Sequence, residues 1–230
     1  MKPLIYLLIS ILLWNQPTHS KENDRPIYGI LTQPFNNNPY SYTSNYLAAS
    51  YVKFIEGSGG RVVPIHWDSS ETEIRKVFGK INGVLWPGGG TGFKGDPLTP
   101  FGEVGKLLYD LVIEANQKGD YMPLYVECLG FEMLNYIVTM DKNFMESTSD
   151  HDCRQNIEFY VDPHTTRFYR NISDELLQQI SNDEIVYFNH GYGFTKSRWL
   201  GNPIITKNYS LLSFNKDNNG YDVVDAIEHK

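Results

Sequence analysis

The chain has 230 residues, 41% of them hydrophobic, and a formal net charge of −7. This length suits one domain with a sizeable core, since single domains of up to about 250 residues are common. The negative charge argues against nucleic acid and anionic membrane surfaces as partners. Only two cysteines are present, Cys128 and Cys153, whereas a small secreted fold held by disulfides normally uses more. A bridge between the two is formally possible, but it would consume Cys128, whose surroundings point to catalysis.

The first twenty residues have the pattern of a secretory signal peptide. The start is positively charged, residues 4–14 are apolar, and Thr18 and Ser20 are small residues at the −3 and −1 positions of a cleavage point. The apolar stretch is shorter than the roughly 20 residues of a membrane-spanning helix; an uncleaved anchor or a buried helix is the alternative. We expect a signal peptide at 1–20, one domain at 21–230, and a product in the secretory pathway, lysosome or vacuole, or outside the cell.

Two asparagines fit the acceptor pattern for N-glycosylation. Asn171 and Asn208 each begin an Asn-x-Ser triplet. In a chain that begins with a signal peptide, both are candidate glycosylation sites, although such triplets are frequent by chance.

From residue 26 to residue 138, strand patterns alternate with helical ones. The pattern predicts strands and helices in turn at 27–31, 45–56, 61–65, 70–78, 83–86, 101–116 and 123–126, beginning and ending with a strand. Such alternation is typical of a parallel sheet with helices on both faces. Ligands of these sheets gather at the carboxyl ends of the strands.

After about residue 141 the pattern is weaker. It predicts a short helix at 173–180, a strand at 185–189, and a β-hairpin made of 209–214 and 221–227. No linker, repeat or low-complexity tract divides the chain, so the weaker half is expected to belong to the same α/β domain.

The junction after the strand at 123–126 is the most informative segment. Cys128 lies there, between an apolar strand and a helix expected to begin near Phe131. A sharp strand-to-helix turn would lift the sulfur out of the sheet, and the helix would point its free N–H groups and positive dipole end at it. This arrangement predicts a nucleophilic cysteine. The alternative is an inert buried thiol, which is the usual state of a free cysteine.

A run of glycines ends the neighbouring strand at 83–86. Gly88 and Gly89 would place bare backbone N–H groups at the same edge of the sheet as Cys128, where they could stabilise an oxyanion. A loop that needs positive φ would also favour glycine. Combined with Cys128, the glycines predict acyl transfer from an amide through a thioester.

Five stretches of the sequence resemble a known family. They are Ala-Ala-Ser-Tyr-Val-Lys at 48–53, Gly-Arg-Val-Val-Pro at 60–64, Ile-Asn-Gly-Val-Leu-Trp-Pro-Gly-Gly at 81–89, Gly-Asp-Tyr-Met-Pro at 119–123 and Cys-Leu-Gly-Phe-Glu at 128–132. In this order they resemble the γ-glutamyl hydrolases of the class I glutamine amidotransferase-like superfamily. The resemblance implies a three-layer sandwich with a mostly parallel central sheet. It also implies cleavage of folyl- or antifolyl-poly-γ-glutamates without a metal or cofactor, in a secreted, lysosomal or vacuolar protein.

The resemblance also assigns roles to residues. Cys128 falls on the family nucleophile, and the N–H of Leu129 with one from Gly88 or Gly89 would form the oxyanion hole. Glu132 and His190 would contact the substrate. The alternatives are that Glu132 is an ordinary first-turn acid stabilised by the helix dipole and that His190 is structural.

Two departures from the family pattern flank the nucleophile. Val126 stands where the family usually has glycine, and a β-branched residue should strain a tight turn. Glu127 stands where a small or neutral residue is common. A carboxylate facing inward would raise the pKa of the Cys128 thiol, so we expect Glu127 to point away.

The third departure concerns the general base. The family's catalytic histidine lies in a late Gly-Val-Gln-Trp/Phe-His-Pro-Glu segment, which this sequence does not contain. His229 is not followed by Pro and Glu, and His66, His151 and His164 lie on segments that the family does not use, so no general-base histidine is assigned. We expect the last strand and helix of the fold to be missing, because the sequence is incomplete at its C-terminus or because it is a natural degenerate form.

Three functions follow as hypotheses. The first is a γ-glutamyl hydrolase with a small-molecule poly-γ-glutamate substrate, with a homodimer as an option for its assembly. The second is a glutaminase that supplies ammonia to a synthase, which the signal peptide and Glu132 oppose. The third is a catalytically inactive binder of γ-glutamyl compounds, because proton transfer by a general base is worth roughly 10²–10⁴-fold in rate.

Overall fold

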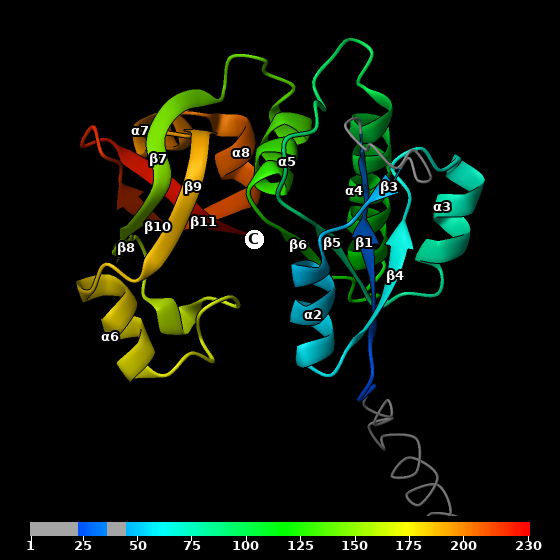
Figure 1. Ribbon diagram of the computed structural model, residues 1–230, viewed down its shortest axis with the longest axis horizontal. Helices are drawn as coiled ribbons and strands as arrows, with labels where there is room; N and C mark the ends of the chain where they lie inside the picture. Colours follow the sequence, from blue (N-terminus) through cyan, green and yellow to red (C-terminus); the bar gives the residue numbers. More distant parts are fainter. Residues whose placement is uncertain (1–22, 36–44) are drawn as a thin grey trace, which may run out of the picture.

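The computed structural model describes residues 23–35 and 45–230 of the chain (Figure 1). The predicted signal peptide at 1–20 therefore lies outside the described residues. Within the part that is described, no helix combines the length and the apolar character that crossing a membrane requires.

A four-stranded sheet forms the centre of the N-terminal half. Its order is β4-β1-β5-β6, and all neighbouring strands are parallel. The strands are β1 (Ile27–Leu31), β4 (Arg61–Ile65), β5 (Gly83–Trp86) and β6 (Leu124–Val126). All four predicted strands are confirmed, and the mixed α/β architecture with a central parallel sheet fits the class I glutamine amidotransferase-like fold.

Helices cover both faces of this sheet (Figure 1). They are α2 (Ala49–Gly57), α3 (Glu71–Phe78), α4 (Pro100–Gln117) and α5 (Leu129–Thr139). Ile30 and Leu85 pack with Ile55 of α2, whereas the adjacent strand residues Leu31 and Val84 belong to the cluster formed with the other three helices. Side chains alternate between faces along a strand, so each buried strand contributes to both layers.

The predicted helix boundaries hold to within two residues except at the start of one helix. The capping box predicted for α3 is present, since Glu73 accepts from the Ser70 backbone N–H at 2.9 Å and its own N–H donates to the Ser70 hydroxyl. The helix predicted to begin at residue 45 begins instead at Ala49. Asn45–Tyr46 forms a short strand, β3, which pairs with β2 (Gln33–Pro34).

The C-terminal half is built from antiparallel pairs. Strands β10 (Tyr209–Lys216) and β11 (Asp222–His229) form the predicted hairpin, and β8 (Ile157–Phe159) joins it in the order β11-β10-β8. A second pair is formed by β7 (Glu146–Gln155) and β9 (Val186–Gly193), and Asn215 of β10 donates to Asp150 of β7 at 3.2 Å. Strands β7 and β8 were not predicted, because β7 reads Glu-Ser-Thr-Ser-Asp-His-Asp-Cys-Arg-Gln and offers no apolar pattern.

Four short helices complete this half, and the last two of them pack against the first half. They are η1 (Pro163–Thr165), α6 (Asp174–Asn182), α7 (Lys196–Leu200) and α8 (Pro203–Asn208). Trp199 and Ile205 from α7 and α8 share one buried cluster with Met133 of α5. The indole N–H of Trp199 donates to the side-chain oxygen of Asn135 on α5 at 3.1 Å, and both residues are buried. The two halves therefore share one core on this side and separate on the other.

Candidate active site

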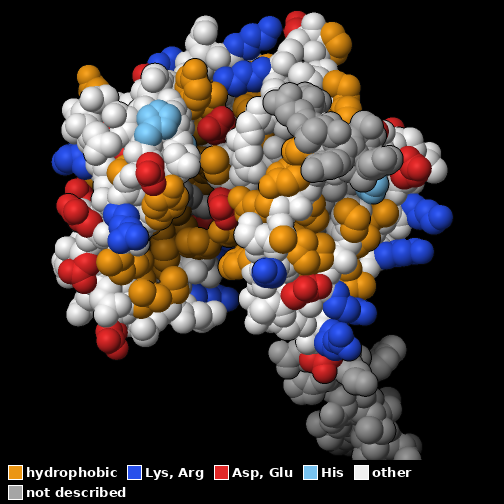
Figure 2. Space-filling model, viewed as in Figure 1, with side chains coloured by type: hydrophobic (Ala, Val, Ile, Leu, Met, Phe, Trp, Pro, Cys, Tyr) orange, Lys and Arg blue, Asp and Glu red, His pale blue; other side chains and the backbone are white. Residues whose placement is uncertain are grey.

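A cleft of about 1460 Å³ opens between the two halves. The space-filling view shows the surface hollowed there, with hydrophobic side chains along both sides (Figure 2). Its walls include α4 and β6 on one side and β9 and β11 on the other. Five of the six residues to which the resemblance assigns a role line it: Cys128, Gly88, Gly89, Glu132 and His190.

Cys128 occupies a strained turn between β6 and α5. Its φ is 48° and its ψ is −110°, a region that non-glycine residues adopt at a cost of order 1–3 kcal/mol and that concentrates at functional sites. The helix begins at Leu129, two residues earlier than predicted near Phe131. Val126 lies in β6 opposite Trp86, and the positive φ falls on the cysteine, so the strain does not reside in the β-branched residue.

The sulfur meets two backbone N–H groups. Cys128 is a free, exposed cysteine at the cleft surface. The protein around the sulfur still removes part of its water, and this desolvation raises the pKa of the thiol. Hydrogen bonds from the N–H of Gly89 and the N–H of Leu129 lower that pKa, whereas the nearby charges of Glu132 and Glu127 raise it. The same two N–H groups would face the oxyanion of a substrate carbonyl group that the sulfur has attacked.

The two glycines differ in what their N–H groups contact. The Gly88 N–H donates to the Tyr51 hydroxyl at 2.8 Å, and the Gly89 N–H faces the sulfur. The Gly88 carbonyl accepts from the side-chain amide of Gln33 at 2.7 Å. Of the two donors that the sequence left open, the structure therefore presents Gly89 to Cys128.

Both positions need glycine because other atoms come too close. A Cβ on Gly88 would lie 2.8 Å from the Tyr51 hydroxyl and 3.1 Å from the Cys128 Cβ. A Cβ on Gly89 would lie 2.1 Å from the side-chain oxygen of Gln33. The glycine run therefore allows the loop to come close to Cys128 and to Gln33.

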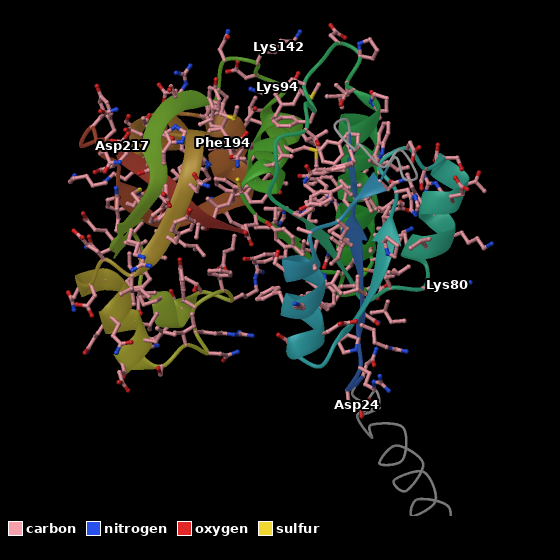
Figure 3. The ribbon with its side chains drawn as sticks, in the orientation of Figure 1. Asp24, Lys80, Lys94, Lys142, Phe194 and Asp217 are labelled. Atoms are coloured by element: carbon pink, nitrogen blue, oxygen red, sulfur yellow. The ribbon has the colours of Figure 1, made fainter. Side chains whose placement is uncertain are left out.

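Glu132 lies in the first turn of α5 and lines the cleft. Desolvation raises the pKa of its carboxyl to about 7, and the positive charge of Lys94 opposes this shift. Figure 3 labels Lys94 near the top of α5. At neutral pH the carboxyl is divided between its neutral and charged forms, so it can donate to or accept from a polar ligand.

His190 lies on β9, on the opposite wall. Its Nδ1 is 3.2 Å from the Thr148 hydroxyl, and its Nε2 is 3.9 Å from a carboxylate oxygen of the fully buried Asp150. Burial lowers the pKa of His190, and the charge of Asp150 raises it. Within residues 23–35 and 45–230, no hydrogen bond or ion pair joins a histidine to Cys128.

Glu127 contacts a residue that sequence reasoning did not single out. Its carboxylate accepts a hydrogen bond from the Tyr51 hydroxyl at 3.0 Å. Tyr51 and Gln33 hold the loop that faces the sulfur, and neither has a motif of its own. Tyr51 does fall in one of the family-like stretches, at 48–53, but the resemblance assigns it no role.

Of the remaining predicted positions, Cys153 and Asn171 lie outside the cleft, whereas Asn208 lies on its wall. Cys153 is a free cysteine on β7. Asn171 lies in an exposed turn before α6. The Asn208 side chain is half-buried at the end of α8, and its amide donates to the Ile204 carbonyl at 3.3 Å. In the described part of the chain, no group of three or more His, Cys, Asp or Glu side chains is placed to hold a metal ion.

Comparison with known proteins identifies the family of this chain. The family model described as Peptidase C26 matches residues 26–191, which include Cys128 and His190. γ-Glutamyl hydrolase B of Dictyostelium discoideum is 32% identical over 234 residues, 98% of this chain and 63% of that protein. γ-Glutamyl hydrolase of Rattus norvegicus is 32% identical over 87% of the chain and 62% of its own length. The human γ-glutamyl hydrolase is 30% identical over 86% and 62%, respectively.

The chain thus spans a little over 60% of the length of the curated relatives that it matches. The family model covers most of the described fold, from the first strand of the central sheet to β9. This chain belongs to the Peptidase C26 family.

Proposed function

We propose that the protein hydrolyses γ-glutamyl bonds of folyl-poly-γ-glutamates through a thioester on Cys128. One observation carries this proposal: the sulfur lies on a strained strand-to-helix turn against the glycine loop, where a Cβ on Gly88 would lie 3.6 Å from it, and the N–H groups of Gly89 and Leu129 lower the pKa of its thiol. The three relatives named above are γ-glutamyl hydrolases by name, which supports the same chemistry.

The proposed reaction proceeds in two steps. The Cys128 thiolate attacks the carbonyl carbon of the γ-amide, and the carbonyl oxygen becomes an oxyanion held by the Gly89 and Leu129 N–H groups. The C–N bond then breaks, the amine leaves with the proton that the thiol gave up, and a thioester remains on the sulfur. Water adds to the thioester through a second oxyanion, which releases the γ-carboxylate and restores the thiol.

The electrostatics of the cleft make proton handling the demanding part of this reaction. Desolvation, Glu132 and Glu127 all raise the pKa of the thiol, so little thiolate exists at neutral pH until a base removes the proton. Glu132, whose own pKa lies at about 7, can take up or release a proton near the sulfur in this range. We assign Glu132 to contact with the substrate. Its proton exchange in this pH range follows from the burial that raises its pKa.

The walls of the cleft support an aromatic substrate. The rings of Tyr125 and Phe168 stack with their centroids 6.5 Å apart and their planes 18° apart, and Phe168 is 48% exposed. Flat aromatic surfaces of this kind attract other flat rings, such as the pteridine of a folate. The volume of the cleft also leaves room for a pteroyl group and several glutamate units.

A second function, binding of γ-glutamyl compounds without turnover, is favoured by the position of His190. Its two ring nitrogens face Thr148 and Asp150. A base that serves Cys128 must reach the thiol proton directly or through one water. On this hypothesis the cleft retains the substrate, and the thioester does not form.

Compartment and modification belong to the same proposal. The signal-peptide pattern at 1–20 supports entry into the secretory pathway. Exposure of Asn171 supports its glycosylation, and the bonded, half-buried Asn208 is the weaker acceptor. Digestion of the secreted protein with a glycosidase, followed by mass measurement, tests both positions.

The test of function compares the 230-residue chain with its Cys128→Ala and Cys153→Ser variants. The proteins are incubated with pteroyl-poly-γ-glutamate, released glutamate is measured, and acid-quenched samples are weighed by mass spectrometry. Hydrolysis predicts glutamate release and a thioester in the chain and in Cys153→Ser, and neither in Cys128→Ala. Binding of the substrate with no thioester and no release would favour the inactive binder, and absence of both binding and release would exclude both functions.

A further inference from the structure

Glu127 presents a problem for a cysteine nucleophile. It precedes Cys128 directly, and its charge raises the pKa of the thiol. A residue that only hindered thiolate formation would be a defect next to the nucleophile. The structure instead gives its carboxylate a specific partner, the hydroxyl of Tyr51 at 3.0 Å.

We propose that Glu127 is a positioning residue that, through Tyr51, holds the glycine loop of the oxyanion hole against the cysteine turn. The inference rests on the proposed thioester chemistry and deepens it. Glu127 touches neither the substrate carbonyl nor the sulfur in this role, so it acts only through the geometry of the loop.

The contact joins three elements that no other side-chain hydrogen bond links in the described residues. Glu127 belongs to the turn before α5, Tyr51 to α2, and Gly88 to the loop after β5. The Tyr51 hydroxyl accepts from the Gly88 N–H at 2.8 Å and donates to Glu127 at 3.0 Å. The cysteine turn and the glycine loop are therefore tied to the same oxygen atom.

The direction of these hydrogen bonds follows from the chemistry of a phenol. Burial, together with the charge of Glu127, raises the pKa of Tyr51, so the hydroxyl keeps its single proton. That proton goes to the carboxylate, and the remaining lone pairs face the Gly88 N–H. A carboxylate acceptor makes a stronger hydrogen bond than water or a neutral group, which fixes the rotation of the hydroxyl.

The position of the loop decides the oxyanion hole. A Cβ placed on Gly88 would lie 2.8 Å from the Tyr51 hydroxyl and 3.6 Å from the Cys128 sulfur, so the three groups are in near contact. If the hydroxyl turned away, the Gly88 N–H would lose its acceptor and the loop would move. The Gly89 N–H, one residue further on, would then no longer face the Cys128 sulfur.

The two effects of Glu127 have opposite signs, and two substitutions separate them. Glu127→Gln removes the charge and keeps a carbonyl oxygen that can accept from Tyr51. Glu127→Leu removes both the charge and the acceptor at similar size. Loss of the charge should lower the pKa of the thiol in both variants, whereas loss of the acceptor should disturb the oxyanion hole in the leucine variant only.

The experiment uses the full chain in a Cys153→Ser background, so that Cys128 is the only thiol. The thiol pKa is measured from thiolate absorbance against pH. Acylation is measured as the burst of p-nitrophenolate from a γ-glutamyl p-nitrophenyl ester, whose leaving group needs no proton from the protein. Glu56→Leu, an exposed glutamate near the end of the same helix as Tyr51, is the matched control and should change neither quantity.

We expect Glu127→Gln to acylate, at equal thiolate, within about twofold of the parent, and Glu127→Leu about tenfold more slowly, a fraction of the 10²–10³ that a complete oxyanion donor supplies. The thiol pKa should be lower in Glu127→Gln than in Glu127→Leu, because only the glutamine variant keeps the Gly89 N–H on the thiolate. In a Tyr51→Phe background the glutamine and leucine variants should become equal.

Equal acylation rates and equal thiol pKa values in the glutamine and leucine variants would overturn the inference. Glu127 would then act on the thiol only through its charge. A parent chain that titrates normally but gives no burst would instead contradict the proposed thioester chemistry. In that case the difference between the two thiol pKa values still decides whether Glu127 positions the loop.

Discussion

The side-chain amide of Gln33 donates to the carbonyl oxygen of Gly88 at 2.7 Å. The peptide between Gly88 and Gly89 is trans, so its N–H points opposite to its carbonyl. Anchoring the carbonyl on Gln33 therefore turns the Gly89 N–H toward the Cys128 sulfur. Gln33 is itself fixed, since it is 5% exposed and its oxygen accepts from the Thr91 hydroxyl at 3.0 Å.

Replacing Gln33 should impair acylation in a pH-dependent manner. Gln33→Met removes the donor at similar size, and we expect the burst with a γ-glutamyl p-nitrophenyl ester to slow by about 10–100-fold. Gln33→Glu lacks the donor when ionised but regains one when protonated. The ratio of the Gln33→Glu rate to the Gln33→Met rate should therefore rise as the pH falls. A ratio that stays constant from pH 8 to pH 5 would show that Gln33 does not orient the peptide.

The glycine loop offers a matched pair of substitutions. Gly89→Ala places a Cβ 2.1 Å from the Gln33 side chain, whereas a Cβ on Gly90 meets nothing within 4 Å. We expect Gly89→Ala to lose at least tenfold in acylation rate, because either Gln33 or the loop must move and one oxyanion donor is misplaced. Gly90→Ala should acylate like the parent chain. Similar losses in both variants would mean that general loop stiffness matters and that the close approach at Gly89 does not.

The sequence alone indicated the parallel sheet and the place of Cys128 on a strand-to-helix turn at its edge. Strands such as 27–31 and 83–86 are short apolar runs bounded by turn residues. This pattern can be recognised without knowing which strands pair with them. Cys128 and the glycines were recognisable because they follow such strands directly. Strand β7 was missed because its ten residues are mostly polar and are held by pairing with β9.

The contacts that orient the site could not be predicted in the same way. Gln33 and Gly88 are 55 residues apart, and Tyr51 and Glu127 are 76 apart. Neither pair follows from local periodicity, because each depends on how β2, α2 and the loops meet in space. The sequence predicted that Glu127 points away from the sulfur. It did not indicate Tyr51 as the hydrogen-bond partner of Glu127.

Glu132 should make the folded protein less stable as the pH rises. Burial raises the pKa of its carboxyl from about 4.5 to about 7, so the folded chain holds this proton more tightly than the unfolded chain does. The resulting stabilisation is complete below about pH 4.5 and is lost as the pH rises through about 7. Glu132→Gln removes this titration, and we expect it to exceed the parent in stability by about 1–3 kcal/mol at pH 8 relative to the difference at pH 4.5.

Urea unfolding at the two pH values checks this prediction. Glu103→Gln, an exposed glutamate in the first turn of α4, is the matched control and should follow the parent at both. If the difference between Glu132→Gln and the parent is the same at pH 4.5 and pH 8, the carboxyl does not titrate as its burial implies.

The hydrogen bond between Asn135 and Trp199 should couple the two halves of the molecule energetically. Asn135 is fully buried, and its amide also donates to the Phe131 carbonyl at 2.9 Å. Asn135→Ala leaves the indole N–H without an acceptor and opens a cavity, so we expect a loss of about 2–4 kcal/mol in the free energy of unfolding. Trp199→Phe leaves the Asn135 oxygen unpaired and should cost about 1–3 kcal/mol.

The double variant should lose less than the sum by at least about 0.5 kcal/mol, because each single change already breaks the shared bond. Urea unfolding, with the exposed Asn143→Ala as control, measures all four values, and strict additivity would show that the bond does not hold the halves together.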